Sequence, residues 1–192
     1  MFEIFQHYIS SKATLSNEEY NLIKSVCILK KLRKKQYLLQ EGDVWKYNAF
    51  VCKGCVRSYR LDEKGNEHIL NFAQENWWTG DRESLLTANP SKLNIDAIED
   101  SEIILITKDN FERLCTQIPA LNSLINNIIN KSFITSQERI HAAMSYTAEE
   151  KYIAFIEKHA DLSVRLPQHM IASYLGITPE TLSRVRKEII KK

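Results

Sequence analysis

The five glycines of this 192-residue chain divide it more clearly than any other residue type. Four of them separate short runs that are rich in β-branched and aromatic residues: Gly42, Gly54, Gly65 and Gly80. Glycine readily adopts the positive φ that tight turns need, so each run between two glycines is expected to be a strand. Many short strands joined by regularly spaced turns are typical of a β-sandwich or barrel. The sequence therefore predicts one β-domain across residues 29–107.

The stretch after this domain has the pattern of one long helix. From Pro119 to about Ser145 there is no glycine and no further proline, and a helix of that length would extend for roughly 40 Å at ~1.5 Å per residue. Both sides of its first half are apolar, which allows packing on its own domain and also on a second copy of itself; core packing alone is the alternative. We predict a dimer through this helix, held by an apolar stripe at Leu121, Leu124, Ile125 and Ile128.

Two capping boxes mark the starts of further helices. Ser16 and Glu19 have the spacing in which each side chain accepts a hydrogen bond from the other residue's backbone N–H, and Thr147 and Glu150 repeat this spacing. We therefore divide the chain into a β-domain with an N-terminal helix, a long dimerisation helix and a helical C-terminal domain, at residues 1–114, 115–145 and 146–192.

The most informative motif is "IASYLGITPETLSRVRKEI", residues 171–189. A helix-turn-helix needs a small residue where its two helices cross, a residue that tolerates the αL conformation in the turn, and an apolar anchor on the second helix. Ala172, Gly176 and Leu182 fill these roles, at gaps of four and six residues. The alternative is a structural helical hairpin of the kind found in many proteins that do not bind DNA.

The second helix of this motif has the residues of a DNA reader. Thr178 can cap it, Pro179 suits the first helical position, and Glu180 complements the positive end of the helix dipole. Arginine pairs with guanine O6 and N7, glutamate accepts from cytosine N4, and serine reaches either type of base edge. We therefore expect a DNA-binding face made of Thr178, Pro179, Glu180, Ser183, Arg184 and Lys187.

Charge and composition agree with a nucleic-acid partner. Residues 162–192 carry six Lys/Arg against two Asp/Glu, whereas residues 1–113 carry 16 against 17. A solvated basic tail is the alternative explanation. The longest aliphatic run, "IILI" at 103–106, is far below the ~20 residues of a membrane span, and the N-terminus lacks the basic region of a signal peptide. We expect a cytoplasmic protein with no membrane partner, whose four cysteines are thiols.

A β-domain, a long helix and a C-terminal helix-turn-helix resemble the Crp/Fnr family of bacterial transcription regulators. The resemblance covers nearly the whole chain. It rests on "FVCKGCVRSYRLDEKGNEHILNF" in the β-domain, on "GD" at 42–43 and 80–81, and on "ETLSR" at 180–184, which is similar to the recognition helix of the Fnr branch. "ENWWTGD", "IPAL" and the tail look most like members from Bacteroidetes. The resemblance implies an α+β fold, with an N-terminal double-stranded β-roll (a cyclic-nucleotide-binding-like jelly roll), a long dimerisation helix and a helix-turn-helix.

The resemblance also implies partners. A homodimer would bind an inverted repeat of double-stranded DNA with half-sites related to TTGA, and RNA polymerase would be a further partner. Arg184 would contact the guanine, Glu180 the cytosine of the opposite strand, and Ser183 would lie beside the neighbouring thymines. Only about five residues follow Lys187, so we expect no full wing after the recognition helix.

Cyclic-AMP-binding members of the family hold the phosphate with an arginine and a hydroxyl, because a guanidinium and a hydroxyl together clamp the anion. The corresponding stretch here lacks the arginine and offers only a weak ligand set: Asp81, Arg82, Ser91 and Lys92. Lys92 can hold a phosphate as a point charge, and Arg82 can turn inward. We expect no tight binding of cyclic AMP, and the effector stays unknown.

The oxygen-sensing members of the family bind an iron–sulfur cluster through cysteines near the N-terminus. This chain has no cysteine before Cys27, and its only CxxC, Cys52 to Cys55, falls on a predicted hairpin turn. A metal site would need two more ligands, and Cys27, His68 and Cys115 offer no supporting spacing. We expect no iron–sulfur cluster, no metal and no other cofactor.

We interpret the chain as a homodimeric, sequence-specific DNA-binding regulator and not as an enzyme, since no nucleophile motif or cluster of His, Cys and carboxylates is present. Two alternatives stay open. One is a thiol-based redox sensor on the same scaffold, with Cys52 and Cys55 as the switch; oxidation would then change the DNA affinity. The other is a ligand-binding or protein-interaction module whose tail does not bind DNA, which salt-dependent binding to duplex DNA would exclude.

Overall fold

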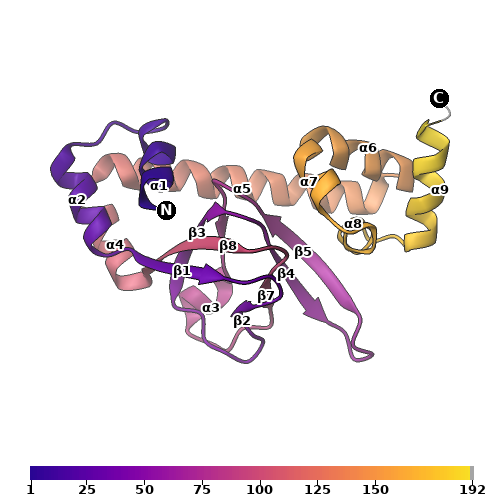
Figure 1. The fold of residues 1–192 in the computed structure, drawn as a ribbon, viewed down its shortest axis with the longest axis horizontal. Coiled ribbons are helices and arrows are strands. Elements are labelled where there is room, and N and C mark those ends of the chain that lie inside the picture. Colours follow the sequence, from indigo (N-terminus) through magenta and orange to yellow (C-terminus); the bar gives the residue numbers. More distant parts are fainter. Residues whose placement is uncertain (191–192) are drawn as a thin grey trace. The chain divides into compact units, whose positions relative to one another are not determined.

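The computed structural model describes residues 1–190, so Lys191 and Lys192, which belong to the expected basic tail, lie outside the described residues. The chain divides into two compact units, whose elements are labelled in Figure 1. Unit 1 comprises Met1–Arg60 and Asn71–Ile129, and unit 2 comprises Leu61–Leu70 and the chain from Asn130 onward. Within the described part of the chain, no helix is both long and apolar enough to cross a membrane.

Unit 1 is built on two four-stranded β-sheets, which confirms the predicted β-roll. The first sheet has the strand order β1-β8-β3-β6 and the second has the order β2-β7-β4-β5. Strand β8 pairs antiparallel with β1 and β3, and β7 pairs antiparallel with β2 and β4. The strands are β1 (Ile28–Leu32), β2 (Tyr37–Leu39), β3 (Tyr47–Lys53), β4 (Val56–Leu61), β5 (Glu67–Ala73), β6 (Trp78–Thr79), β7 (Asn94–Ala97) and β8 (Ser101–Thr107).

The central strands β3 and β8 are buried on both faces. Because successive side chains of a strand point to opposite faces, Phe50 and Ile104 enter one core while Val51 and Ile103 enter another. The first core is shared with helices, and the second contains residues of both sheets. A strand that is covered on both sides needs apolar residues at every position, which explains the continuous run at residues 103–106.

The helices of unit 1 are α1 (Phe2–Ser10), α2 (Asn17–Ser25), α3 (Arg82–Thr87) and α4 (Lys108–Gln117). Helix α2 begins with the predicted capping box, in which the backbone N–H of Glu19 donates to the Ser16 hydroxyl and that of Ser16 donates to the Glu19 carboxylate. Helix α1 has no side-chain cap, so no local motif in the sequence predicted where it begins. Helices α1, α2 and α4 all contribute to the first core.

The long helix α5 spans Pro119–Ser145, as the sequence predicted. Residues 115–117, which we had assigned to this helix, belong to α4. Leu121 and Leu124 are 2% and 8% exposed in the core of unit 1, so they are not available for a contact with a second copy. This corrects the predicted dimer stripe at Leu121 and Leu124, whereas Ile125 and Ile128 are partly buried against the same core. The large apolar side chains that α5 leaves exposed lie further along the helix: Phe133, Ile134, Ile140 and Met144.

Unit 2 contains the second part of α5 and four shorter helices: α6 (Ala148–Lys158), α7 (Ala160–Arg165), α8 (Gln168–Leu175) and α9 (Pro179–Ile190). Helix α6 starts with the second predicted capping box, at Thr147 and Glu150. The helices bury a small apolar core: Phe155, Leu162, Leu166, Ile171, Ala172, Leu182 and Val185. Helix α9 is the last element within the described residues, which therefore show no wing.

The tip of the β4–β5 hairpin, residues 61–70, belongs to unit 2. Ser173 of α8 holds it through a hydroxyl that donates to the Glu67 carbonyl at 2.7 Å and accepts from the Ile69 N–H at 3.0 Å. Arg139 of α5 donates to the Leu70 carbonyl. These contacts join residues 69 to 106 positions apart in the sequence, and no sequence pattern indicated them.

The turn between β3 and β4 depends on a glycine for two reasons. Gly54 has a φ of +88°, and a Cβ at this position would lie 2.3 Å from the Ser101 hydroxyl and 2.7 Å from the Asp100 carbonyl oxygen. Gly65 has a similar φ of +80°, but a Cβ there would meet nothing within 4 Å. The first position combines backbone strain with a steric clash, and the second has backbone strain alone.

We expect Gly54→Ala to lower the free energy of unfolding by about 2 kcal/mol or more, and Gly65→Ala to lower it by only about 1 kcal/mol, because a positive φ alone has a modest cost. Urea unfolding followed by tryptophan fluorescence measures both values. Equal losses for the two variants would show that the approach of residues 100–101 to the turn does not constrain it.

Candidate nucleic-acid interface

The turn between α8 and α9 has the geometry expected of a helix-turn-helix. Gly176 is in the left-handed region, with φ 66° and ψ 34°. Its N–H donates to the Ser173 carbonyl, and the N–H of Ile177 donates to the Ala172 carbonyl at 3.0 Å. This pair of hydrogen bonds is a Schellman motif, which satisfies carbonyls at the end of a helix and needs a residue that tolerates αL. The role assigned to Gly176 from the sequence is confirmed.

Helix α9 is capped at its first turn. The hydroxyl of Thr178 accepts from the Thr181 N–H at 3.2 Å, and Pro179 is the first helical residue. Glu180 accepts from its own backbone N–H and from the Thr178 side chain, and these contacts hold the pKa of its carboxyl below the usual value. Since a lowered pKa favours the ionised form, this exposed carboxylate is negatively charged near neutral pH.

Two buried residues decide which face of α9 is turned outward. Leu182 is fully buried and Val185 is 4% exposed, and Ala172 of α8 is also fully buried. At roughly 100° per residue, the five expected DNA-contacting positions within α9 (179, 180, 183, 184 and 187) occupy an arc of about 140° on the opposite side of the helix. All six residues expected to contact DNA are exposed: Thr178, Pro179, Glu180, Ser183, Arg184 and Lys187. Pro179, Glu180, Ser183, Arg184 and Lys187 therefore share one face of α9, and Thr178 caps its N-terminus.

The weak ligand set in the β-roll is not assembled as a phosphate clamp. Ser91 is 3% exposed and donates its hydroxyl proton to the Asp81 carboxylate at 2.6 Å. The other carboxylate oxygen of Asp81 accepts the N–H groups of Glu83 and Ser84 and caps α3. A phosphate beside this serine would therefore meet the Asp81 carboxylate.

The two cations of the set lie on the surface. Arg82 and Lys92 are exposed, and Lys92 is 3.9 Å from the exposed carboxylate of Glu83. The buried guanidinium of this unit is Arg57, which makes a two-pronged ion pair with Asp96 at 2.8 and 3.1 Å. Because that carboxylate already neutralises it, Arg57 does not replace the missing arginine. These residues do not fit a cyclic phosphate.

The cysteines do not form a metal or cluster site. Among residues 1–190, no group of three or more His, Cys, Asp or Glu side chains is placed to hold a metal ion. Cys52 and Cys55 are 2% and 1% exposed. Burial raises the pKa of Cys52 to about 11 and that of Cys27 to about 12. Thiolates are the ligands of iron–sulfur clusters and the reactive form in redox switches, so the raised pKa values disfavour both roles at Cys27 and Cys52.

Comparison with known proteins finds relatives that are regulatory proteins. The cyclic nucleotide-binding domain family matches residues 29–118. The anaerobic regulatory protein of Haemophilus influenzae is 26% identical over 184 residues, which cover 90% of this chain and 71% of that protein. The regulatory protein HlyX of Actinobacillus pleuropneumoniae is 27% identical, with 90% and 76% covered. The structure of FixK2 from Bradyrhizobium japonicum superposes with a TM-score of 0.75 at 20% identity, covering 86% of this chain and 85% of that chain.

The relatives that match are Crp/Fnr-type transcription regulators with a cyclic nucleotide-binding-like domain, and such regulators are not enzymes. The chain resembles the Crp/Fnr family in its β-roll, in its C-terminal helices and in its sequence.

We expect Cys52 and Cys55 to react slowly with Ellman's reagent in the folded protein. For Cys52, a pKa of about 11 instead of 9.0 leaves roughly a hundredfold less thiolate at mildly alkaline pH. Burial slows the access of the reagent to both thiols. The measurement uses a Cys27→Ala, Cys115→Ala background, in which only these two thiols remain, and takes the same chain in guanidinium chloride as the fully reactive reference. Native and unfolded chains that react at the same rate would restore the redox-sensor hypothesis.

Proposed function

We propose that this chain is a homodimeric, sequence-specific DNA-binding transcription regulator in which α9 enters the major groove. The observation that carries the proposal is the single exposed face of α9, which bears Glu180, Ser183, Arg184 and Lys187 opposite the buried Leu182. An α-helix fits the major groove, where each base pair presents a distinct pattern of donors and acceptors. A structural hairpin would not require this combination of a base-reading arginine, a charged glutamate and a lysine on one face.

The proposed roles follow from side-chain chemistry. Arg184 donates in a fork to guanine O6 and N7, and Glu180 accepts from the cytosine N4 amine of the opposite strand. Ser183 lies beside the neighbouring bases. Lys187, one turn further along α9, contacts the phosphate backbone, which fixes position but reads no sequence. Thr178 and Pro179 hold the start of the helix close to the groove.

The proposed dimer forms through the second half of α5. Phe133, Ile140 and Met144 are 64%, 56% and 83% exposed, which is unusual for side chains of this size. Helical spacing of four, seven and four residues from Ile129 places Ile129, Phe133, Ile140 and Met144 on one stripe. A second copy of the helix would cover this stripe. Relatives of the Crp/Fnr family act as dimers and contact RNA polymerase, and we extend both properties to this chain.

We further propose that the β-roll does not respond to cyclic AMP, because the Ser91 hydroxyl is bonded to Asp81 and the side chains of Arg82 and Lys92 are exposed. The redox alternative is disfavoured by the burial of Cys52 and Cys55. The second alternative, a module whose tail does not bind DNA, is disfavoured by the exposed and capped helix α9.

Substitutions on α9 distinguish a contact with a base from a contact with the phosphate backbone. We expect Arg184→Ala to weaken binding to the preferred site by ~1–3 kcal/mol per half-site and to relax the preference at the G·C pair, because a two-pronged base contact is lost. Lys187→Ala should weaken all duplexes nearly alike and reduce the salt slope by about one per subunit, because a phosphate contact is lost. Fluorescence anisotropy with specific and scrambled duplexes at several salt concentrations measures both effects.

The control for these variants is Lys46→Ala, which removes an exposed lysine from unit 1 and should change neither quantity. If Arg184→Ala lowers the affinity for specific and scrambled duplexes equally, Arg184 does not read a base. If neither substitution on α9 has an effect, the tail is a structural hairpin.

The dimer proposal is tested by charges on the exposed stripe. We expect Phe133→Asp combined with Ile140→Asp to give monomers, because a carboxylate without a partner in a helix seam costs about 3–5 kcal/mol. Lys131→Asp is the matched control, since residue 131 lies about 160° around the helix from residue 133 and should leave the dimer intact. Light scattering gives the mass. A wild-type monomer at micromolar concentration, or monomers for both variants, would contradict the proposed seam.

A further inference from the structure

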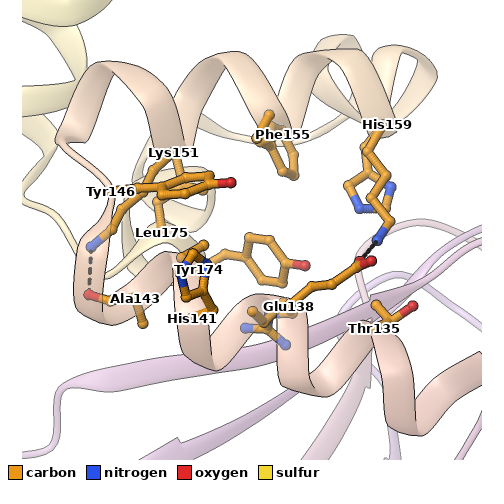
Figure 2. A pocket seen from close by; sticks show the side chains of 14 residues that line it. Thr135, Glu138, His141, Ala143, Tyr146, Lys151, Phe155, His159, Tyr174 and Leu175 are labelled. Atoms are coloured by element: carbon orange, nitrogen blue, oxygen red, sulfur yellow. Dashed lines mark hydrogen bonds and ion pairs between the residues drawn. The ribbon is translucent and has the colours of Figure 1, made fainter.

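Unit 2 contains a cavity of about 360 Å³. It is lined by the second half of α5, by α6 and by the last turn of α8, and Figure 2 shows its side chains. Ligand pockets of proteins start at roughly 300 Å³, so this cavity is large enough for a molecule of one or two rings. No residue of the expected DNA-binding face lines it.

Aromatic side chains form the inner wall of the cavity. Phe155 is 3% exposed, and its ring centroid lies 5.6 Å from that of Tyr174 with an interplanar angle of 58°. Figure 2 shows these two rings in the space between α5 and α6, with Tyr146 beside them. Aromatic rings attract one another in offset and edge-to-face arrangements, so this wall favours an aromatic ligand.

The polar part of the lining has a surplus of positive charge. Arg139, Lys151 and Lys158 line the cavity, and Glu138 is the one carboxylate among its lining residues. The Lys151 ammonium donates to the Ala143 carbonyl at 3.2 Å. The Lys158 ammonium lies 3.4 Å from the Glu138 carboxylate, but both side chains are about half exposed or more, at 48% and 64%. An exposed pair of this kind is weak, so it can yield to a ligand.

Arg139 is positioned by the aromatic wall. Its guanidinium lies over the Tyr174 ring, 4.3 Å from the centroid, and it also donates to the Leu70 carbonyl. A guanidinium has five N–H donors in a fixed plane, so these two contacts leave donors for a carboxylate. Burial and the positive charges of Lys158 and Arg139 lower the pKa of His159, which agrees with a surplus of positive charge in the cavity.

The geometry points to a binding site for a small aromatic carboxylate, with its ring against Phe155 and Tyr174 and its carboxylate on Arg139 and Lys158. A neutral aromatic molecule would leave the positive charges uncompensated, and an inorganic anion would leave the aromatic wall uncovered. A ligand with both features satisfies both parts of the lining. The inference concerns a site separate from the DNA-binding face and does not depend on it.

Isothermal titration calorimetry of the full chain, without DNA, tests the charge and the ring separately. The probes are indole-3-acetate and benzoate, their uncharged counterparts indole-3-acetamide and benzamide, and inorganic phosphate. We expect at least one carboxylate to bind about tenfold or more tightly than its amide, and phosphate to bind no more tightly than the amides. The site is overturned if no carboxylate binds more tightly than its amide, or if phosphate binds as tightly as the carboxylates.

Substitutions locate the binding. Arg139→Gln and Lys158→Gln should each weaken the better carboxylate about tenfold, whereas Lys46→Gln in unit 1 should leave it unchanged. Lys158 is partly exposed and holds a weak ion pair, so its substitution preserves the fold even if that of Arg139 does not; the unfolding midpoint of each variant checks this. Equal affinities for Lys158→Gln and Lys46→Gln would place any binding elsewhere and contradict the inference.

Discussion

The proposed function depends on the burial of two side chains of α9, Leu182 and Val185. Both side chains are buried, and Ala172 of α8 is buried with them, so the two helices approach closely where the small residue lies. The left-handed turn at Gly176 sets the angle at which α9 leaves α8. A rotation of α9 by a single residue would turn Leu182 toward water and bury Arg184 or Ser183. The apolar contact therefore determines which side chains are available to DNA.

In the β-roll, too, the buried residues are engaged in packing and in contacts with one another. Its central strands are buried on both faces, and its buried polar groups satisfy one another: Ser91 with Asp81, and Arg57 with Asp96. A buried ion pair of this geometry is costly to break, because either charge alone would lack a partner in a medium of low dielectric constant. We propose that these pairs serve the fold, whereas in cyclic-AMP-binding members of the family the clamp residues stay available for the ligand.

Local signals predicted much of this structure from the sequence. The capping boxes at Ser16 and Thr147, the turn glycine Gly176 and the exposed face of α9 each depend on residues within one or two helical turns. The β-roll was predicted from glycine spacing and from resemblance. The DNA-binding roles of the exposed residues stay a prediction, because nothing in the structure contacts them.

Other features depend on contacts between distant residues, and the sequence could not reveal them. Helix α5 is apolar on more than one side, and only the position of unit 1's core shows that Leu124 faces inward while Phe133 is exposed. The bond between Ser173 and the β4–β5 hairpin joins positions more than a hundred residues apart. The cavity near Tyr174 is lined by three helices whose residues carry no shared motif.

Selection of bound sequences from a library of random duplexes tests the central claim most directly. A dimer that presents two copies of α9 about one helical turn apart, ~34 Å, should enrich an inverted repeat whose half-sites contain one invariant G·C pair. The same selection with Arg184→Ala should lose the preference at that pair. If the wild-type chain enriches no sequence, or enriches a single half-site without two-fold symmetry, the account of a dimeric DNA reader is contradicted.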